Sequence, residues 1–145
     1  RLDEIGRAAA NGENVLLYPS GRLYRNGKEV IGNASGVHLA LRRAPEAKIM
    51  LVRTRGLWGS SFSCAGGEKP DLGRALIEGI TTLVMNLVFF TPRRTVEIEC
   101  TPAPDDFPRD GSRAEINAWL ENWYNRDGEE PVTAVSSRFW RRASD

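Results

Sequence analysis

Residues 15–25 read VLLYPSGRLYR, in which an apolar run is followed directly by a basic loop. The run at 15–18 lies between Gly12 and Pro19, which predicts a buried strand that ends at the loop. The pair Asn26-Gly27 then predicts a turn. Because ligands of open α/β sheets bind just past strand ends, this stretch predicts a sheet strand and a ligand-binding loop together.

Helix and strand patterns alternate along the rest of the chain. Apolar residues at helical spacing predict a helix of about three turns that begins near Leu2 and ends at Asn11-Gly12, and a second helix from Ser35 or Gly36 to Arg43. A short apolar run predicts a strand at 49–52, and strict alternation predicts another at 95–100. The resulting order of helices and strands predicts an α/β domain with a mostly parallel sheet flanked by helices.

The second half of the chain predicts two further helices. Residues 56–70 are rich in Gly and Ser and predict a long loop. Asp71 can cap the helix that follows, and Pro92 stops it. Its predicted buried stripe consists of Leu72, Leu76, Ile80, Leu83, Val84 and Leu87.

A capping box marks the start of the last helix. Ser112 and Glu115 have the S-x-x-E spacing, and an apolar face follows them at Ile116, Trp119, Leu120 and Trp123. The tail carries apolar residues that we expect to pack back on the domain, namely Val132, Val135, Phe139 and Trp140.

Length and composition favour one globular domain, or part of one. The chain has 145 residues, of which 41% are hydrophobic and 27% charged. The longest nearly uninterrupted apolar run, Leu83–Phe90, is far shorter than the ~20 residues of a membrane-spanning helix. The chain begins at Arg1 in the middle of an amphipathic pattern, which suggests that residues have been removed upstream.

Positive charge is concentrated in the first part of the chain. Residues 1–60 carry 10 basic and 5 acidic groups, whereas residues 61–145 carry 10 basic and 14 acidic groups. Between residues 22 and 55 there are 8 basic and 2 acidic groups. Arg22 and Arg25 have forked donors that suit a phosphate, and Gly21 could present a backbone N–H. Either an anion site or a solvated basic face fits this pattern.

Few residues suit acid–base or nucleophilic catalysis. The single histidine, His38, lies in a predicted helix, and a pair with Cys64 has no local sequence support. Cys64 and Cys100 are typical of reduced thiols in a cytoplasmic protein and form no C-x-x-C metal motif. Asp105 and Asp106 fall in a proline-rich connection that favours solvated turn residues. We therefore assign no catalytic residue and no metal ligand.

The segment at residues 14–21 resembles the third sequence block of the glycerolipid acyltransferases of the lysophosphatidic acid type. That block is a strand followed by Phe-Pro-Glu-Gly-Thr-Arg. Its first four residues align with Tyr18-Pro19-Ser20-Gly21 of this chain. Residues 49–53 take the place of the family's fourth block. The resemblance covers residues 1–60 well. Beyond Gly66, only the order of the helices and strands is similar. It implies the C-terminal part of an acyltransferase-like fold, with Ser20, Gly21, Arg22 and Arg25 holding the acceptor phosphate.

The family's catalytic block, His-x-x-x-x-Asp, is missing from this chain. Five positions after His38 stands Arg43, not an acid. Ser20 also replaces the family's glutamate, and Arg22 its threonine. The resemblance therefore implies that the catalytic block lies upstream and that the 145 residues alone are inactive.

The resemblance implies transfer of a fatty acyl group in phospholipid biosynthesis. The donor would be acyl-CoA or acyl carrier protein, with no bound cofactor, and the acceptor a lysophospholipid or glycerol phosphate. Residues 1–60 would form the phosphate-loop region and 71–145 a helix-strand-helix region with a tail. We expect a cytoplasmic protein, peripheral at the inner face of the membrane, that binds no nucleic acid and can self-associate. The alternative is a non-catalytic α/β module whose basic face binds a phosphorylated ligand or an anionic membrane.

Overall fold

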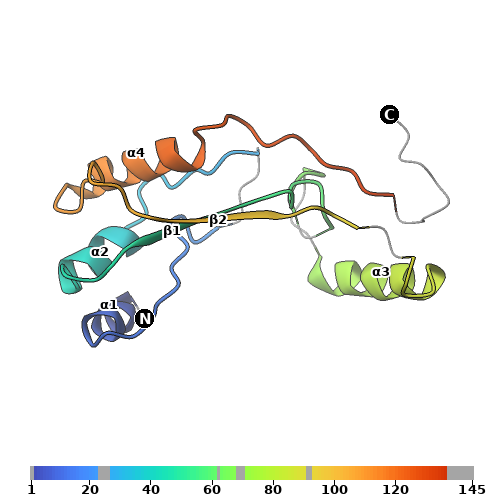
Figure 1. The fold of residues 1–145 in the computed structure, drawn as a ribbon, viewed down its shortest axis with the longest axis horizontal. Helices are drawn as coiled ribbons and strands as arrows, with labels where there is room; N and C mark the ends of the chain where they lie inside the picture. The colour runs from blue at the N-terminus through green and yellow to red at the C-terminus, as the bar shows by residue number, and fades with distance from the viewer. Residues whose placement is uncertain (1, 23–26, 62, 68–70, 91–92, 137–145) are drawn as a thin grey trace. The chain divides into compact units, whose positions relative to one another are not determined.

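A computed structural model describes residues 2–22, 27–61, 63–67, 71–90 and 93–136. The elements follow in the order α1 (Leu2–Ala10), α2 (Gly36–Arg43), β1 (Met50–Arg55), α3 (Leu72–Met85), β2 (Glu97–Pro102) and α4 (Arg113–Tyr124) (Figure 1). These elements divide between two compact units. Among the described residues, the first unit holds 2–22, 28–53 and 99–128, and the second holds 27, 54–98 and 129–136.

The core of the first unit lies where α2, β1 and α4 meet. Leu41 of α2, Leu51 of β1, and Ile116 and Leu120 of α4 are buried together with Ile31 and Phe107. Trp119 and Trp123 pack against this cluster, as the predicted apolar face requires. The sequence predictions of α1, α2 and α4 are confirmed, because each helix has the expected bounds within a few residues.

Polar side chains of α4 hold the segment before α2 in place. The capping box predicted at Ser112 and Glu115 is present in both directions. Further along the helix, Oε1 of Glu121 accepts hydrogen bonds from the backbone N–H groups of Ile31 and Gly32 at 2.6 and 2.7 Å. The buried Nδ2 of Asn117 donates to the backbone oxygen of Gly32 at 2.8 Å. Buried backbone groups of this segment are thereby paired, which a core without a regular sheet neighbour requires.

The prediction of a mostly parallel sheet flanked by helices is wrong. Within the described residues the sheet has two strands, β1 and β2, which run antiparallel. The backbone N–H of Ala103 donates to the oxygen of Ile49 at 3.0 Å, which places Arg53 opposite Glu99. A parallel pair needs a connection whose helix covers the sheet with its apolar face. The connecting helix α3 instead keeps its large apolar side chains exposed.

One face of this strand pair is apolar and uncovered. Leu51 is buried, and Arg53 and Glu99 are half-buried on the same face. Met50, Val52 and Cys100 point the other way and are exposed. The strand pair consequently contributes only one of its two faces to the core.

The second unit is organised by side chains that bind backbone groups. The buried Glu130 accepts hydrogen bonds through Oε1 from the N–H groups of Gly56, at 2.6 Å, and Trp58, at 3.3 Å. The guanidinium of Arg94 donates to the backbone oxygens of Gly56, Gly59 and Thr133. These contacts join distant segments in a unit that contains few regular elements. Trp58 and Cys64 are buried within it.

Two further sequence predictions are wrong. Residues 15–18 form no strand, and the side chains of Leu16 and Tyr18 are 69% and 71% exposed. The predicted buried stripe of α3 is also exposed, including Leu72, Leu76 and Ile80. In both cases the apolar pattern is present in the sequence, but the described residues provide no surface against which it could be buried.

In the described residues the tail is bound to the second unit by Glu130 and by the backbone of Thr133, and not by the apolar side chains that were predicted to pack. Val132 and Val135 are exposed. Phe139 and Trp140 lie outside the described residues.

Candidate functional site

The loop after residues 15–18 forms a tight turn around Gly21. The backbone N–H of Gly21 donates to the oxygen of Tyr18 at 3.1 Å, and Gly21 has a φ of +62°. The Ser20 hydroxyl accepts from the N–H of Arg22 at 3.3 Å and donates to the oxygen of Arg22 at 3.1 Å. Among the described residues, no atom lies within 4 Å of the position that a Cβ on Gly21 would take. These residues therefore leave the glycine side of the turn open to an incoming group.

Three of the four predicted phosphate-binding residues come together in this turn. Ser20, Gly21 and Arg22 are adjacent, and Arg22 is exposed. Arg25 lies outside the described residues. The Ser20 hydroxyl stabilises the turn itself, because both of its hydrogen bonds go to the backbone of Arg22. Arg22 is thus the side chain of this turn with an exposed cationic group.

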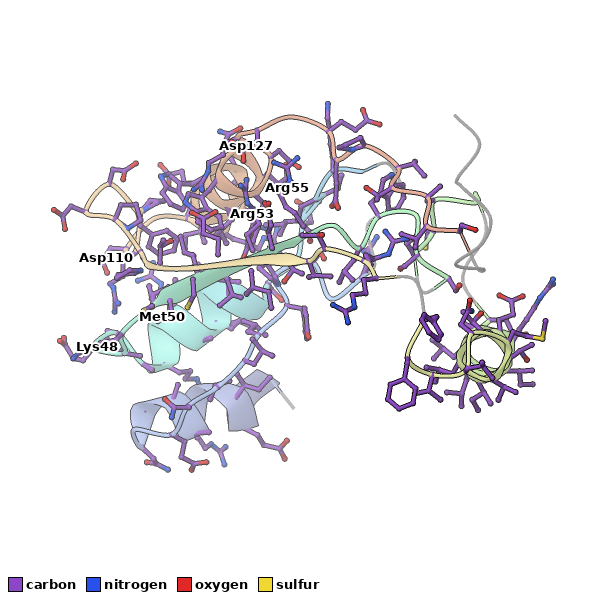
Figure 2. The ribbon with its side chains drawn as sticks, turned by 45° about the vertical axis from the view of Figure 1, so that its right-hand side comes forward. Lys48, Met50, Arg53, Arg55, Asp110 and Asp127 are labelled. Carbon is purple, nitrogen blue, oxygen red and sulfur yellow. The ribbon has the colours of Figure 1, made fainter. Side chains whose placement is uncertain are left out.

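A second group of basic residues has a structural role. In the first unit, Arg53 of β1 and Arg126 after α4 both contact Glu99 of β2: Nε of Arg53 lies 3.4 Å from the carboxylate, and Arg126 donates to both carboxylate oxygens. Arg53 also pairs with Asp127, beside which it lies in Figure 2. The two guanidinium carbons lie 6.0 and 4.7 Å from the ring centre of Trp123. These charges are compensated within the protein and are poorly placed to bind an external anion.

The carboxylate of Glu99 makes the stability of the first unit depend on pH. The hydrogen bond from Arg126, together with the charges of Arg126 and Arg53, holds the pKa of Glu99 below its ordinary value of 4.5. A lowered pKa stabilises the folded state above the ordinary value, and this contribution is lost as the pH falls through the folded-state pKa. We expect the free energy of unfolding to fall as the pH drops below about 4.5. Urea titrations at several pH values should show a shallower fall in Glu99→Gln.

An open pocket of about 770 Å³ lies in the first unit, beside the end of the strand pair. Lys48, Met50 and Asp110 line it and are labelled in Figure 2, with Phe107 and Arg109 also in its wall. The guanidinium of Arg109 donates to the backbone oxygens of Pro45 and Ala47. The guanidinium of Arg109 is therefore bound within the pocket wall. Lys48 contributes an exposed cationic group to the pocket.

The other reactive side chains that the structure describes form no catalytic group. His38 is half-buried in α2. Cys64 is buried in the second unit, and Cys100 is exposed on β2. Asp105 and Asp106 are exposed, and Asp106 accepts a hydrogen bond from the indole of Trp119 at 3.0 Å. Within the described ranges, no group of three or more His, Cys, Asp or Glu side chains could hold a metal ion.

The sequence prediction missed the Arg53–Glu99–Arg126 network and the pocket at Lys48. Alternation at 95–100 places Glu99 on the polar face of its strand, but the partner strand is not given by that pattern. The proline-rich connection at 102–108 predicts solvated turn residues, and it forms part of the pocket wall. No signal within either segment links it to residues 48–53.

Comparisons of the chain with models of protein families, with curated proteins and with solved structures found no match. In the part of the chain that the structure describes, no helix has the length and apolar content needed to cross a membrane.

Proposed function

We propose that this chain is the C-terminal portion of an acyltransferase of phospholipid biosynthesis. The enzyme would move a fatty acyl group from acyl-CoA or acyl carrier protein to a lysophospholipid or a glycerol-phosphate type acceptor. The turn at Ser20, Gly21 and Arg22, with Arg25, would bind the phosphate of the acceptor. We place the protein in the cytoplasm, peripheral at the inner face of the membrane.

The observation that carries this proposal is the exposed strand-like segment that leads into the turn. Residues 15–18 have the apolar composition of a buried strand, yet Leu16 and Tyr18 are exposed. A second exposed surface with apolar residues lies on the strand pair, at Met50, Val52 and Cys100. Apolar surfaces of this kind are covered in a complete domain. Further residues of the same domain would cover them and would bring a catalytic base to the loop.

The chemistry of the reaction fits this division of roles. The acceptor hydroxyl forms a bond to the thioester carbon, the carbon–sulfur bond breaks, and the hydroxyl proton passes through a base to the leaving thiol. The family's base is a histidine in His-x-x-x-x-Asp, and we assign no such base in these residues. Arg22 contributes to holding the acceptor, because a guanidinium pairs well with a phosphate.

The test is acyl transfer by a longer protein that includes the residues encoded upstream of Arg1. We expect turnover of a lysophospholipid by the longer protein and none by residues 1–145 alone. Arg22→Ala should raise KM for the phosphate-bearing acceptor by about tenfold. Arg42→Ala, a control at an exposed basic residue at the end of α2, should leave KM unchanged.

Two results would contradict the proposal: an upstream sequence without His-x-x-x-x-Asp, or acyl transfer by residues 1–145 unaided. A third result supports the non-catalytic module in its place. In that case the longer protein would show no turnover, and its binding to phosphate-bearing lipid vesicles would weaken steeply with salt.

A further inference from the structure

The helix α3 meets its own unit with its small and polar side. At 3.6 residues per turn, Ala75, Thr82 and Asn86 fall on one side of the helix. Ala75 and Asn86 are only 4% and 0% exposed, and Thr82 is half-buried. Nδ2 of Asn86 donates to the backbone oxygen of Thr82 at 2.6 Å. This orientation is the reverse of an ordinary amphipathic helix, which buries its apolar side.

The opposite side of α3 is apolar and exposed. Ile77 and Val84 are 67% and 66% exposed. The charged residues Arg74 and Glu78 lie elsewhere on the helix and pair with each other at 3.0 Å. We call this surface the α3 apolar face, and it consists of Leu72, Leu76, Ile77, Ile80, Leu83 and Val84. A contiguous exposed apolar surface of this kind marks a binding site.

Apolar exposure continues beyond the end of the helix. Leu87 and Val88 have φ values of 50° and 62°, so the chain turns sharply after Asn86. Both side chains are exposed, as are those of Phe89 and Phe90 that follow. A helix with an apolar face and exposed aromatic residues at its end is typical of segments that insert into the boundary between lipid headgroups and acyl chains.

The charges around this surface favour a lipid partner over a second copy of the chain. Between residues 71 and 94 there are three arginines and two carboxylates, and the exposed Arg93 follows the two phenylalanines. Anionic phosphate headgroups complement this positive charge. The segment has a net charge of +1, so a second copy would bring a net charge of the same sign to the contact.

The length of α3 determines how it could meet a membrane. Its 14 residues extend over about 21 Å, which is shorter than the ~30 Å hydrocarbon core of a bilayer. The helix therefore cannot span the bilayer and would lie along its surface.

We propose that the α3 apolar face docks on the surface of a phospholipid bilayer, with α3 parallel to the membrane plane. Ile77, Val84 and Phe89 enter the outer part of the acyl-chain region, and Arg93 lies at the level of the headgroup phosphates. The inference rests on the proposed peripheral location and is tested by vesicle binding without acyl transfer, so the two proposals can fail separately.

The experiment is sedimentation of the 145-residue chain with vesicles of phosphatidylcholine and phosphatidylglycerol. We expect the unchanged chain to bind and the double variant Ile77→Asn, Val84→Asn to lose at least about tenfold in partition coefficient. Leu16→Asn is the matched control, since Leu16 is equally exposed but lies in the first unit, and it should bind as the unchanged chain does. Circular dichroism of each variant verifies that its helices remain.

Three outcomes would overturn the proposal. The first is failure of the unchanged chain to sediment with the vesicles. The second is a loss of binding in the control as large as that in the double variant. The third is a dimer that light scattering detects without vesicles and that the double variant dissociates, which would assign the face to a second copy. The salt dependence of vesicle binding distinguishes docking through the α3 apolar face from binding through the basic segment at 22–55. Raising salt from about 0.1 to about 1 M shortens the Debye length roughly threefold and should weaken apolar docking far less than charge-driven binding.

Discussion

Replacing Gly56 by alanine is expected to lower the free energy of unfolding of the second unit by roughly 3 kcal/mol or more. Gly56 has a φ of +92°, a conformation that side chains with a Cβ rarely adopt. A Cβ at this position would also lie 2.2 Å from the backbone oxygen of Thr95. Because this neighbour is backbone, it cannot move aside as a flexible side chain would. Relief of the clash would also disturb the hydrogen bonds that Gly56 makes with Glu130 and Arg94.

The control for Gly56→Ala is Gly67→Ala. Gly67 has a similar φ of +87°, but no atom of the described residues lies within 4 Å of the position that its Cβ would take. The control therefore contains the backbone strain of about 1–2 kcal/mol without the clash. Hydrogen exchange at the amides of Gly56 and Trp58, which both donate to Glu130, reports the opening of this unit. Equal loss of protection in the two variants would show that the close approach to Thr95 contributes nothing.

Helix positions were predictable from the sequence because their signals are local. Ser112 and Glu115 satisfy each other within one turn, so the capping box forms wherever that helix packs. Asp71 likewise accepts hydrogen bonds from the N–H groups of Gly73 and Arg74, as a predicted cap should. Which face of a helix becomes buried is not a local property. The sequence marks the stripe of α3 as apolar, but burial depends on a surface that the described residues do not supply.

The sheet was mispredicted for a related reason. The apolar runs at 15–18 and 49–52 have similar composition, yet among the described residues only the second run belongs to a strand with a partner. A strand needs a hydrogen-bonding neighbour, and that neighbour is chosen by the whole fold. The direction of pairing between β1 and β2 is a property of the long connection between them, which periodicity does not report.

The candidate site was predictable only in its local part. Ser20, Gly21 and Arg22 form a turn because a glycine at positive φ and a serine hydroxyl act within three residues. The excess of basic residues between 22 and 55 left open whether they form an anion site or a solvated basic face. Arg53 is opposite Glu99 and contacts Asp127, so its charge is neutralised within the first unit. That neutralisation involves residues more than 40 positions away, beyond the reach of any local pattern.

The core of the first unit provides the second large effect. Ile116→Ala is expected to lower the free energy of unfolding of this unit by about 2–5 kcal/mol. Ile116 is 0% exposed and lies in the cluster where α2, β1 and α4 meet. Removing three of its side-chain carbons takes apolar contacts from Leu41, Leu51 and Leu120 together and leaves a cavity, because packed neighbours relax only partly. Hydrogen exchange at the amide of Leu120, combined with urea titration, measures the loss.

Ile77→Ala is the matched control for this change. The substitution is identical and also lies within a helix, so the gain in helix propensity from isoleucine to alanine is common to both variants. Ile77 is 67% exposed, so little buried surface is lost. The difference between the two variants therefore isolates the burial of Ile116. If the two variants lose the same stability, the cluster around Ile116 does not hold the first unit together, and the position of α4 beside the segment before α2 must depend on the polar contacts of Glu121 and Asn117.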